Sequence, residues 1–75
     1  MREDRHTVVL VYSTSHALRA EKVLAEAGIP CKLIPVPRQL SSDCGVCIRI
    51  HTDDRAAARG VLNVAGLEIE GIHDV

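Results

Sequence analysis

The order of apolar runs along this 75-residue chain is the feature that most restricts its fold. Two segments carry apolar residues at helical spacing: one spans about residues 15–27, and the other starts at Thr52 or Asp53 and ends at Gly66. Four short runs are strand-like, at residues 7–12, 31–36, 46–51 and 67–72. The predicted order is therefore strand, helix, strand, strand, helix, strand.

Local signals support the predicted helix ends. Ser13, Thr14 and Ser15 are good N-cap residues before the first helix, while Gly28 and Pro30 end it. The second helix is expected to turn an inner stripe toward the sheet, formed by Ala57, Val61, Leu62 and Ala65. Gly66 then ends this helix.

This order of elements is the ferredoxin-like α+β arrangement, a four-stranded antiparallel sheet with two helices on one face. The usual strand order, 4-1-3-2, leaves residues 31–36 at an edge, where Pro35 is tolerated. The run at 7–12 is apolar on both faces, so one of its sides must face the open side of the sheet. We expect a homodimer or partner surface there, and a protected central strip is the alternative.

The composition narrows the function classes. Apolar residues form 47% of the chain and Tyr12 is its only aromatic residue, so aliphatic side chains must fill the core. A net charge of −1 provides no basic field for nucleic acid, and the longest apolar run, residues 8–12, cannot span a bilayer. Residues 1–6 do not resemble a signal peptide. We expect a single domain over residues 1–75, located in the cytoplasm, that binds neither nucleic acid nor membrane.

The stretch from Pro35 to Gly45 joins two predicted strands, and it is too long and too particular for a simple hairpin turn. Cys44 lies in this polar loop, whereas structural cysteines usually lie inside apolar runs. The same loop also contains Arg38, Ser41 and Ser42. A cysteine in such surroundings is placed to react, so the loop predicts thiol chemistry.

The predicted topology gives Cys44 a set of neighbours. The end of the first strand, the start of the first helix and the loop after the second strand should meet at one end of the sheet. The supporting residues expected there are Arg38, Ser41, Ser42, Gly45, Ser13, Ser15 and His16. Free cysteine has a pKa of ~8.5, and helix N–H groups and an arginine favour the thiolate. We therefore hypothesise a lowered pKa for Cys44.

Each of these residues also has a simpler interpretation. Cys44 is then an inert loop thiol and Arg38 a surface charge. Ser13 and Ser15 only cap the helix, and His16 is a solvated or capping residue. Cys31 starts a strand at the opposite end of the sheet, where packing is its expected role.

Cys44 and Cys47 form a C-x-x-C pair. In such a pair Cys47 would be the resolving cysteine, which forms a disulfide with Cys44. In an extended segment the two Cα atoms are about 10 Å apart, whereas a disulfide needs less than about 7 Å. Only a tight turn at Gly45 would bring them together. No regular second ligand pair follows, so we expect no metal site and no resident cofactor.

The chain resembles a small prokaryotic family of selenium/sulfur carrier-like proteins. The resemblance rests on residues 13–24, on Ala27-Gly28-Ile29-Pro30 and, most specifically, on Pro35-Val36-Pro37-Arg38 with Ser41-Ser42-Asp43-Cys44-Gly45. It implies a carrier that holds sulfur or selenium on Cys44. Cys47 departs from the expected pattern, since a small or apolar residue is expected at that position.

The resulting hypothesis is a carrier rather than a turnover enzyme. Cys44 would take up sulfur or selenium as a persulfide or selenopersulfide from a donor, such as a cysteine desulfurase or selenocysteine lyase, and pass it to an acceptor protein. Two alternatives remain: a non-catalytic, ligand-binding or regulatory dimeric module, and a C-x-x-C thiol-disulfide or metal-binding module.

Overall fold

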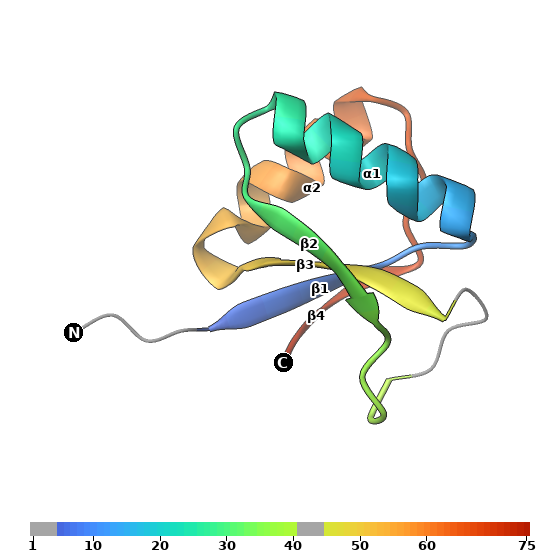
Figure 1. Cartoon of the computed structure of the whole chain (residues 1–75). Helices are drawn as coiled ribbons and strands as arrows, with labels where there is room; N and C mark the ends of the chain where they lie inside the picture. Colours follow the sequence, from blue (N-terminus) through green and yellow to red (C-terminus); the bar gives the residue numbers. More distant parts are fainter. Residues whose placement is uncertain (1–4, 41–44) are drawn as a thin grey trace.

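The computed structural model describes residues 5–40 and 45–75, and it confirms the predicted α+β, ferredoxin-like architecture (Figure 1). The elements are β1 (His6–Leu10), α1 (Thr14–Glu26), β2 (Cys31–Pro35), β3 (Val46–His51), the short 3-10 helix η1 (Thr52–Asp54), α2 (Arg55–Val64) and β4 (Gly71–Asp74). The strand order is β2-β3-β1-β4, and every neighbouring pair is antiparallel. β2 therefore lies at an edge, as Pro35 predicted.

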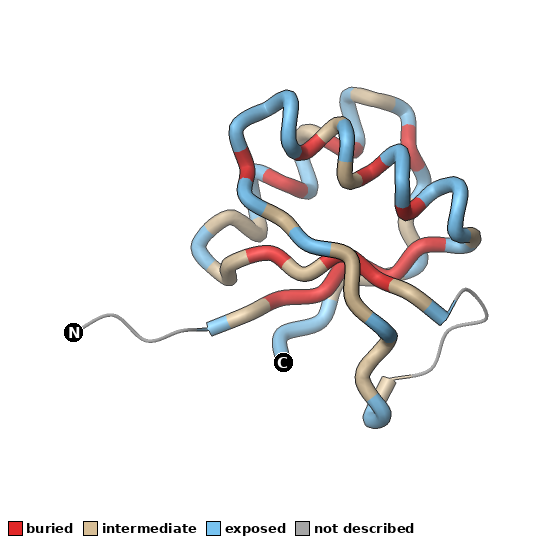
Figure 2. Tube along the Cα trace, viewed as in Figure 1, coloured by how far each residue is buried: buried red, intermediate tan, exposed pale blue. Residues whose placement is uncertain are grey.

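Both helices cover one face of the sheet, and the main core lies between the two layers (Figures 1 and 2). The strands contribute Val9, Ile48 and Ile50, and Val11 follows directly after β1. The helices contribute Ala17, Ala20, Leu24, Ala58 and Leu62. Burial of each large aliphatic side chain stabilises the fold by roughly 1.5–3 kcal/mol. The three alanines let the helices approach the sheet closely, which suits a chain without Phe or Trp.

The inner stripe of α2 differs from the prediction by one position. Ala58 and Leu62 are buried and Val61 is half-buried, whereas Ala57 is exposed. The start of the helical segment also differs, because His51 caps η1: its Nδ1 accepts from the Asp53 N–H at 3.2 Å. Periodicity alone did not show this extra 3-10 turn before α2.

Both helices end in Schellman motifs. Gly28 and Gly66 adopt φ of 78° and 71°, which favours glycine. The N–H of Ile29 donates to Leu24 O at 2.9 Å, and the N–H of Leu67 donates to Leu62 O at 3.0 Å. Each motif also buries the apolar residue after its glycine.

These motifs correct the predicted fourth strand, which was expected to begin at Leu67. Leu67 is apolar because it completes the cap of α2 and packs into the core, and β4 begins only at Gly71. The first strand is corrected in the same way, since β1 ends at Leu10. Val11 is buried beyond its end and Tyr12 is 54% exposed.

The face of the sheet opposite the helices carries a second, smaller apolar cluster. Val8, Leu10 and Cys47 form it, and Val8 and Cys47 are fully buried. The chain itself covers them, because Ile34, Val36 and Leu40 pack against this cluster. The apolar side of β1 is thus the protected central strip that the sequence offered as the alternative, and it is not an exposed apolar patch.

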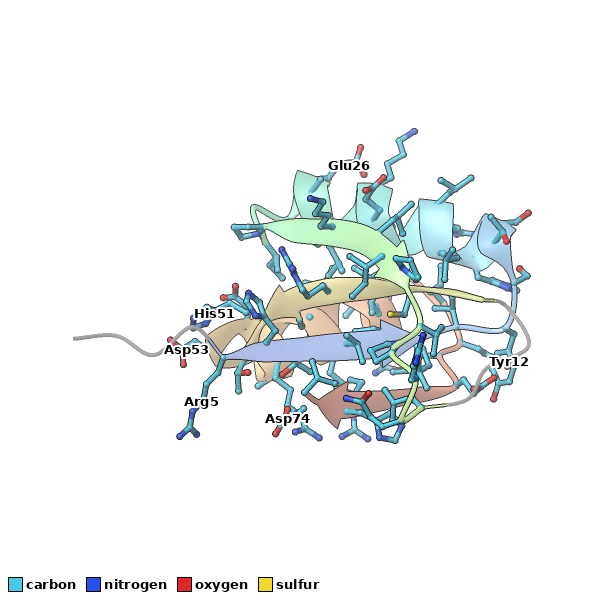
Figure 3. The ribbon with its side chains drawn as sticks, turned by 60° about the horizontal axis from the view of Figure 1, so that its bottom comes forward. Arg5, Tyr12, Glu26, His51, Asp53 and Asp74 are labelled. Atoms are coloured by element: carbon cyan, nitrogen blue, oxygen red, sulfur yellow. The ribbon has the colours of Figure 1, made fainter. Side chains whose placement is uncertain are left out.

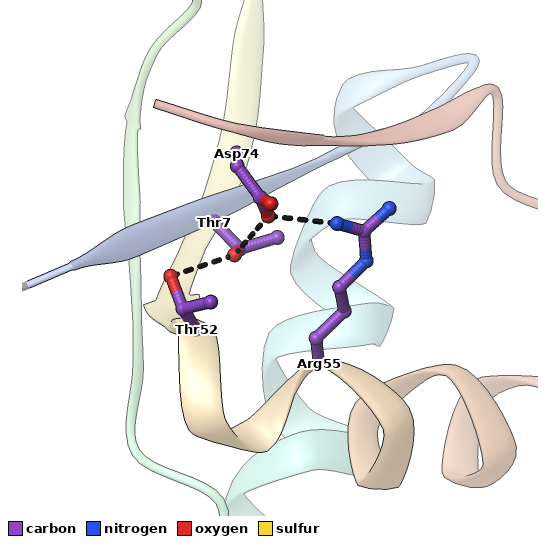
Figure 4. A network of polar contacts seen from close by, with 4 residues as sticks. All are labelled: Thr7, Thr52, Arg55 and Asp74. Carbon is purple, nitrogen blue, oxygen red and sulfur yellow. Dashed lines mark hydrogen bonds and ion pairs between the residues drawn. The ribbon is translucent and has the colours of Figure 1, made fainter.

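A polar network joins β1, β4 and the start of α2 (Figure 4). The hydroxyl of Thr7, which is fully buried, lies 2.8 Å from Asp74 Oδ1 and 3.1 Å from the hydroxyl of Thr52. A carboxylate only accepts, so Thr7 donates to Asp74 and accepts from Thr52. Arg55 donates to the same Asp74 oxygen at 2.8 Å. The network holds the last strand against the sheet and α2.

Candidate functional site

The ends of three strands meet at one end of the sheet, as the topology predicted. Leu10 at the end of β1 pairs with Cys47, and Cys47 pairs with Ile34 near the end of β2. The chain enters α1 from this same end (Figure 1). The turn after β2 and the start of α1 therefore lie at the same end of the sheet.

Ser13 and His16 are brought together at the start of α1. The Ser13 side chain caps the helix by accepting from the His16 N–H at 3.2 Å, and its Oγ lies 2.8 Å from His16 Nδ1. Ser15 is exposed on the same turn. The capping interpretation of Ser13 is thus confirmed, and the imidazole is held at the helix end.

The loop that contains the predicted carrier thiol is anchored at both sides. The Val36 N–H donates to Gly45 O at 3.2 Å, which extends the pairing of β2 with β3. Gly45 has a φ of 80°, a conformation that favours glycine. Ser41, Ser42 and Cys44 lie outside the described residues, so their predicted roles stay predictions.

Arg38 lies in an exposed turn in which the Leu40 N–H donates to Pro37 O at 3.0 Å. This turn is on the open side of the sheet, whereas α1 lies on the other side (Figure 1). Within residues 5–40 and 45–75, Arg38 makes no hydrogen bond or ion pair with Ser13, Ser15 or His16. Its role beside Cys44 also stays a prediction.

Cys47 differs from its expected surroundings. The alternation of residues 46–51 predicts an apolar face of Val46, Ile48 and Ile50 and a polar face that holds Cys47 with Arg49 and His51. The Cys47 thiol is instead fully buried in the open-face cluster. Its Sγ also lies 3.9 Å from Pro35 O. The covering turn makes this position apolar, which a linear pattern could not show. Its pairing with Cys44 stays untested because Cys44 is not described.

Cys31 is half-buried at the other end of the sheet, and its thiol donates to Glu21 O at 3.6 Å. Burial, together with the negative charge of Glu21, raises the pKa of the Cys31 thiol. The thiolate is therefore disfavoured, and the expected packing role fits this environment.

In the part of the chain that the structure describes, no group of three or more His, Cys, Asp or Glu side chains could hold a metal ion. Among those residues, no helix has the length and apolar character needed to cross a membrane.

Two cations outside the predicted site are neighbours on the open face of the sheet. Lys32 pairs with Arg49 across β2 and β3, and Arg49 pairs with Val8 on β1. Directly paired residues share a sheet face, so both cations lie on the open face with Val8. The alternation of residues along β2 and β3 indicates that each strand has a polar side. Only the register of the two strands shows that Lys32 and Arg49 are neighbours.

The model of the family described as "Putative Se/S carrier protein-like" matches residues 6–74 of the chain. Comparison with curated proteins and with solved structures found no match. The family match spans every helix and strand of the sheet domain, together with the loop that contains Cys44.

Proposed function

Because this chain belongs to the Se/S carrier protein-like family, whose model covers residues 6–74, we propose that it carries sulfur or selenium on Cys44. The proposal places the protein in the cytoplasm, where thiols stay reduced. The donor would be a desulfurase or lyase that presents a persulfide or selenopersulfide, and the acceptor a second protein.

Cys44 is the proposed carrier because the surroundings of the other two thiols do not suit sulfur transfer. Cys47 has no exposed surface, so a donor sulfur cannot reach it unless the covering turn of residues 36–40 moves away. Cys31 is half-buried, and its raised pKa keeps it protonated. Transfer needs a thiolate that is accessible to a second protein. Of the three cysteines, only Cys44 lies in a loop between strands.

The transfer step conserves atoms and electrons. The Cys44 thiolate attacks the terminal sulfur of the donor persulfide, the donor S–S bond breaks, and the donor thiolate leaves. The new S–S bond makes Cys44 a persulfide. If the terminal atom is selenium, an S–Se bond breaks on the donor and an S–Se bond forms on Cys44, which becomes a selenopersulfide. In this proposal the N-terminal end of α1 and Arg38 favour the anion, and Gly45 leaves room for the incoming backbone.

Peptide mass mapping after enzymatic loading tests the proposal. The full chain is incubated with a cysteine desulfurase and cysteine, or with a selenocysteine lyase and selenocysteine, and then cleaved with trypsin. Cleavage at Lys and Arg places Cys31 alone on peptide 23–32, whereas Cys44 and Cys47 share peptide 39–49. Fragmentation of peptide 39–49 should place one added sulfur or selenium atom on Cys44.

Matched variants complete this experiment. Loading should be lost in Cys44→Ser and kept in Cys31→Ser and Cys47→Ala. Loading that persists in Cys44→Ser would refute the proposal. A reversible Cys44–Cys47 disulfide without loading would instead favour the C-x-x-C module, and unchanged cellular behaviour of Cys44→Ser would favour a ligand-binding module.

A further inference from the structure

Basic side chains lie on the open sheet face on both sides of the buried Val8. Lys32, Arg49 and His73 lie in one register row, with the buried Val8 between Arg49 and His73. The turn of residues 36–40 packs over Val8 and over Leu10 and Cys47 beyond it, and it leaves the three basic residues at the border of the covered cluster. The exposed remainder is therefore basic, although the whole chain has a net charge of −1.

A hollow of about 220 Å³ opens beside this row. Its lining includes Lys32, Arg49, His6 and His51. The rings of His6 and His51 meet edge to face, with centroids 6.4 Å apart. Because His51 Nδ1 accepts from the Asp53 N–H, the neutral ring carries its proton on Nε2 and offers a donor. The hollow is thus lined by two cations and two imidazole rings, together with Pro30, Cys31 and Ile50, and its cations suit a carboxylate.

Acidic side chains are few on this face. Among the described strand residues, Asp74 is the only acid, and it binds Thr7 and Arg55 on the helix side of the sheet. Asp53 lies 3.5 Å from His51 Nδ1 at the sheet end (Figure 3), but its side chain is 75% exposed. Within residues 5–40 and 45–75, neither Lys32 nor Arg49 forms an ion pair.

This arrangement is unfavourable for the isolated fold. Like charges directly opposite each other on neighbouring strands destabilise a sheet, and no acid offsets Lys32 and Arg49. An anionic partner removes the repulsion when it binds. The unbalanced pair therefore indicates a surface that is completed by a second molecule.

We infer that the basic row and its hollow bind an acidic segment of a protein partner, which presents Asp or Glu side chains. The partner's identity as donor or acceptor rests on the proposed function. Arg49 is four residues from Gly45, about 13 Å along β3, whereas a standard interface covers about 800 Å² on each partner. One docked protein therefore reaches both the basic row and Gly45, which follows Cys44 in the sequence. A second copy fits poorly, because a two-fold contact would place the basic rows against each other.

Nuclear magnetic resonance titration of the isotope-labelled full chain tests this inference. The probe is a short oligo-glutamate peptide, and oligo-glutamine is its uncharged match. We expect oligo-glutamate to shift the backbone amide signals of Lys32, Arg49 and His73, and oligo-glutamine to have no effect. The Lys32→Gln/Arg49→Gln variant should bind oligo-glutamate about tenfold more weakly, since exposed charges each contribute modestly.

A control variant with the same change in net charge is Arg19→Gln/Lys22→Gln on α1, which should bind within about twofold of the parent. An equal loss in both variants would overturn the inference, as would shifts confined to the helix layer. Tighter binding of inorganic phosphate than of oligo-glutamate would mean a free-anion site, and dimerisation through this face would mean a second copy. Either result refutes an acidic protein partner.

The carrier proposal is tested separately with a low-molecular-weight persulfide donor, which needs no docking surface. Loading of Cys44 without oligo-glutamate binding refutes the docking surface alone. Binding without loading supports an acidic partner and refutes the carrier function.

Discussion

Replacement of Lys32 by glutamate should convert a repulsive cross-strand pair into an attractive one. Lys32 lies directly opposite Arg49, and charges about 6 Å apart in water interact by about 0.7 kcal/mol. At physiological ionic strength, screening over a Debye length of about 8 Å roughly halves this value. The variant loses one repulsion and gains one attraction of similar size. We therefore expect its free energy of unfolding to rise by about 0.7 kcal/mol, and by about 1.4 kcal/mol at low salt.

Urea denaturation at 25 °C, followed by circular dichroism, measures this difference. A domain of this size gains roughly 4–8 °C in melting temperature for each kcal/mol, so the thermal midpoint should rise by about 3–6 °C. Lys32→Gln is the matched intermediate, since it removes the repulsion without adding the attraction, and it should show about half the gain. Glutamate and lysine have similarly low strand propensity, so the backbone contributes little.

The salt dependence decides whether the reasoning is correct. The gain of Lys32→Glu should shrink as salt is added, because only the Coulomb interaction is screened. A variant no more stable than the parent, or a gain that is independent of salt, would refute the idea that Lys32 and Arg49 repel each other. The same variant should lose oligo-glutamate binding while it gains stability.

Three further predictions concern other parts of the molecule. Thr7→Val should lower the free energy of unfolding by about 1–2 kcal/mol, because the buried hydroxyl donates to a carboxylate; a urea double-mutant cycle with Asp74→Ala should show coupling, and strict additivity would count against the network. Gly45→Ala should cost about 1 kcal/mol, measured by thermal melting, since φ is 80° there; an unchanged midpoint would contradict this. The raised pKa of Cys31 means that the folded state keeps its proton to higher pH than the unfolded chain does. This contribution to stability is complete below the ordinary thiol pKa and is lost as pH rises toward the folded value. Cys31→Ser should therefore flatten the alkaline decline in urea denaturation series, and an identical decline in both proteins would refute the assignment.

Much of the fold was predictable because its signals are local. Gly28 and Gly66 end the helices in the left-handed conformation that few other residues adopt, and Ser13 caps α1 with its own side chain. Pro35 lacks an N–H and marks β2 as an edge strand. The alternation along β3 matched the observed strand, Val46–His51.

The failures arose where an apolar residue had a partner far along the chain. Leu67 looks like the start of a strand, but it packs into the core as part of the cap of α2. Cys47 alternates with core residues and so looks exposed, yet Val36 and Leu40 fold over it. Periodicity reports only the side on which a residue lies, and it does not report what covers that side.

The amino-acid sequence alone determined the order of strands and helices, the edge position of β2 and the family, because each depends on residues near one another in the chain. Only the tertiary structure decided that Cys47 is closed to partners, that Thr7 is tied to Asp74, and that Lys32 faces Arg49. The physical reason is strand register. Pairing brings together side chains that are distant in the sequence, and both burial and electrostatic repulsion depend on that pairing.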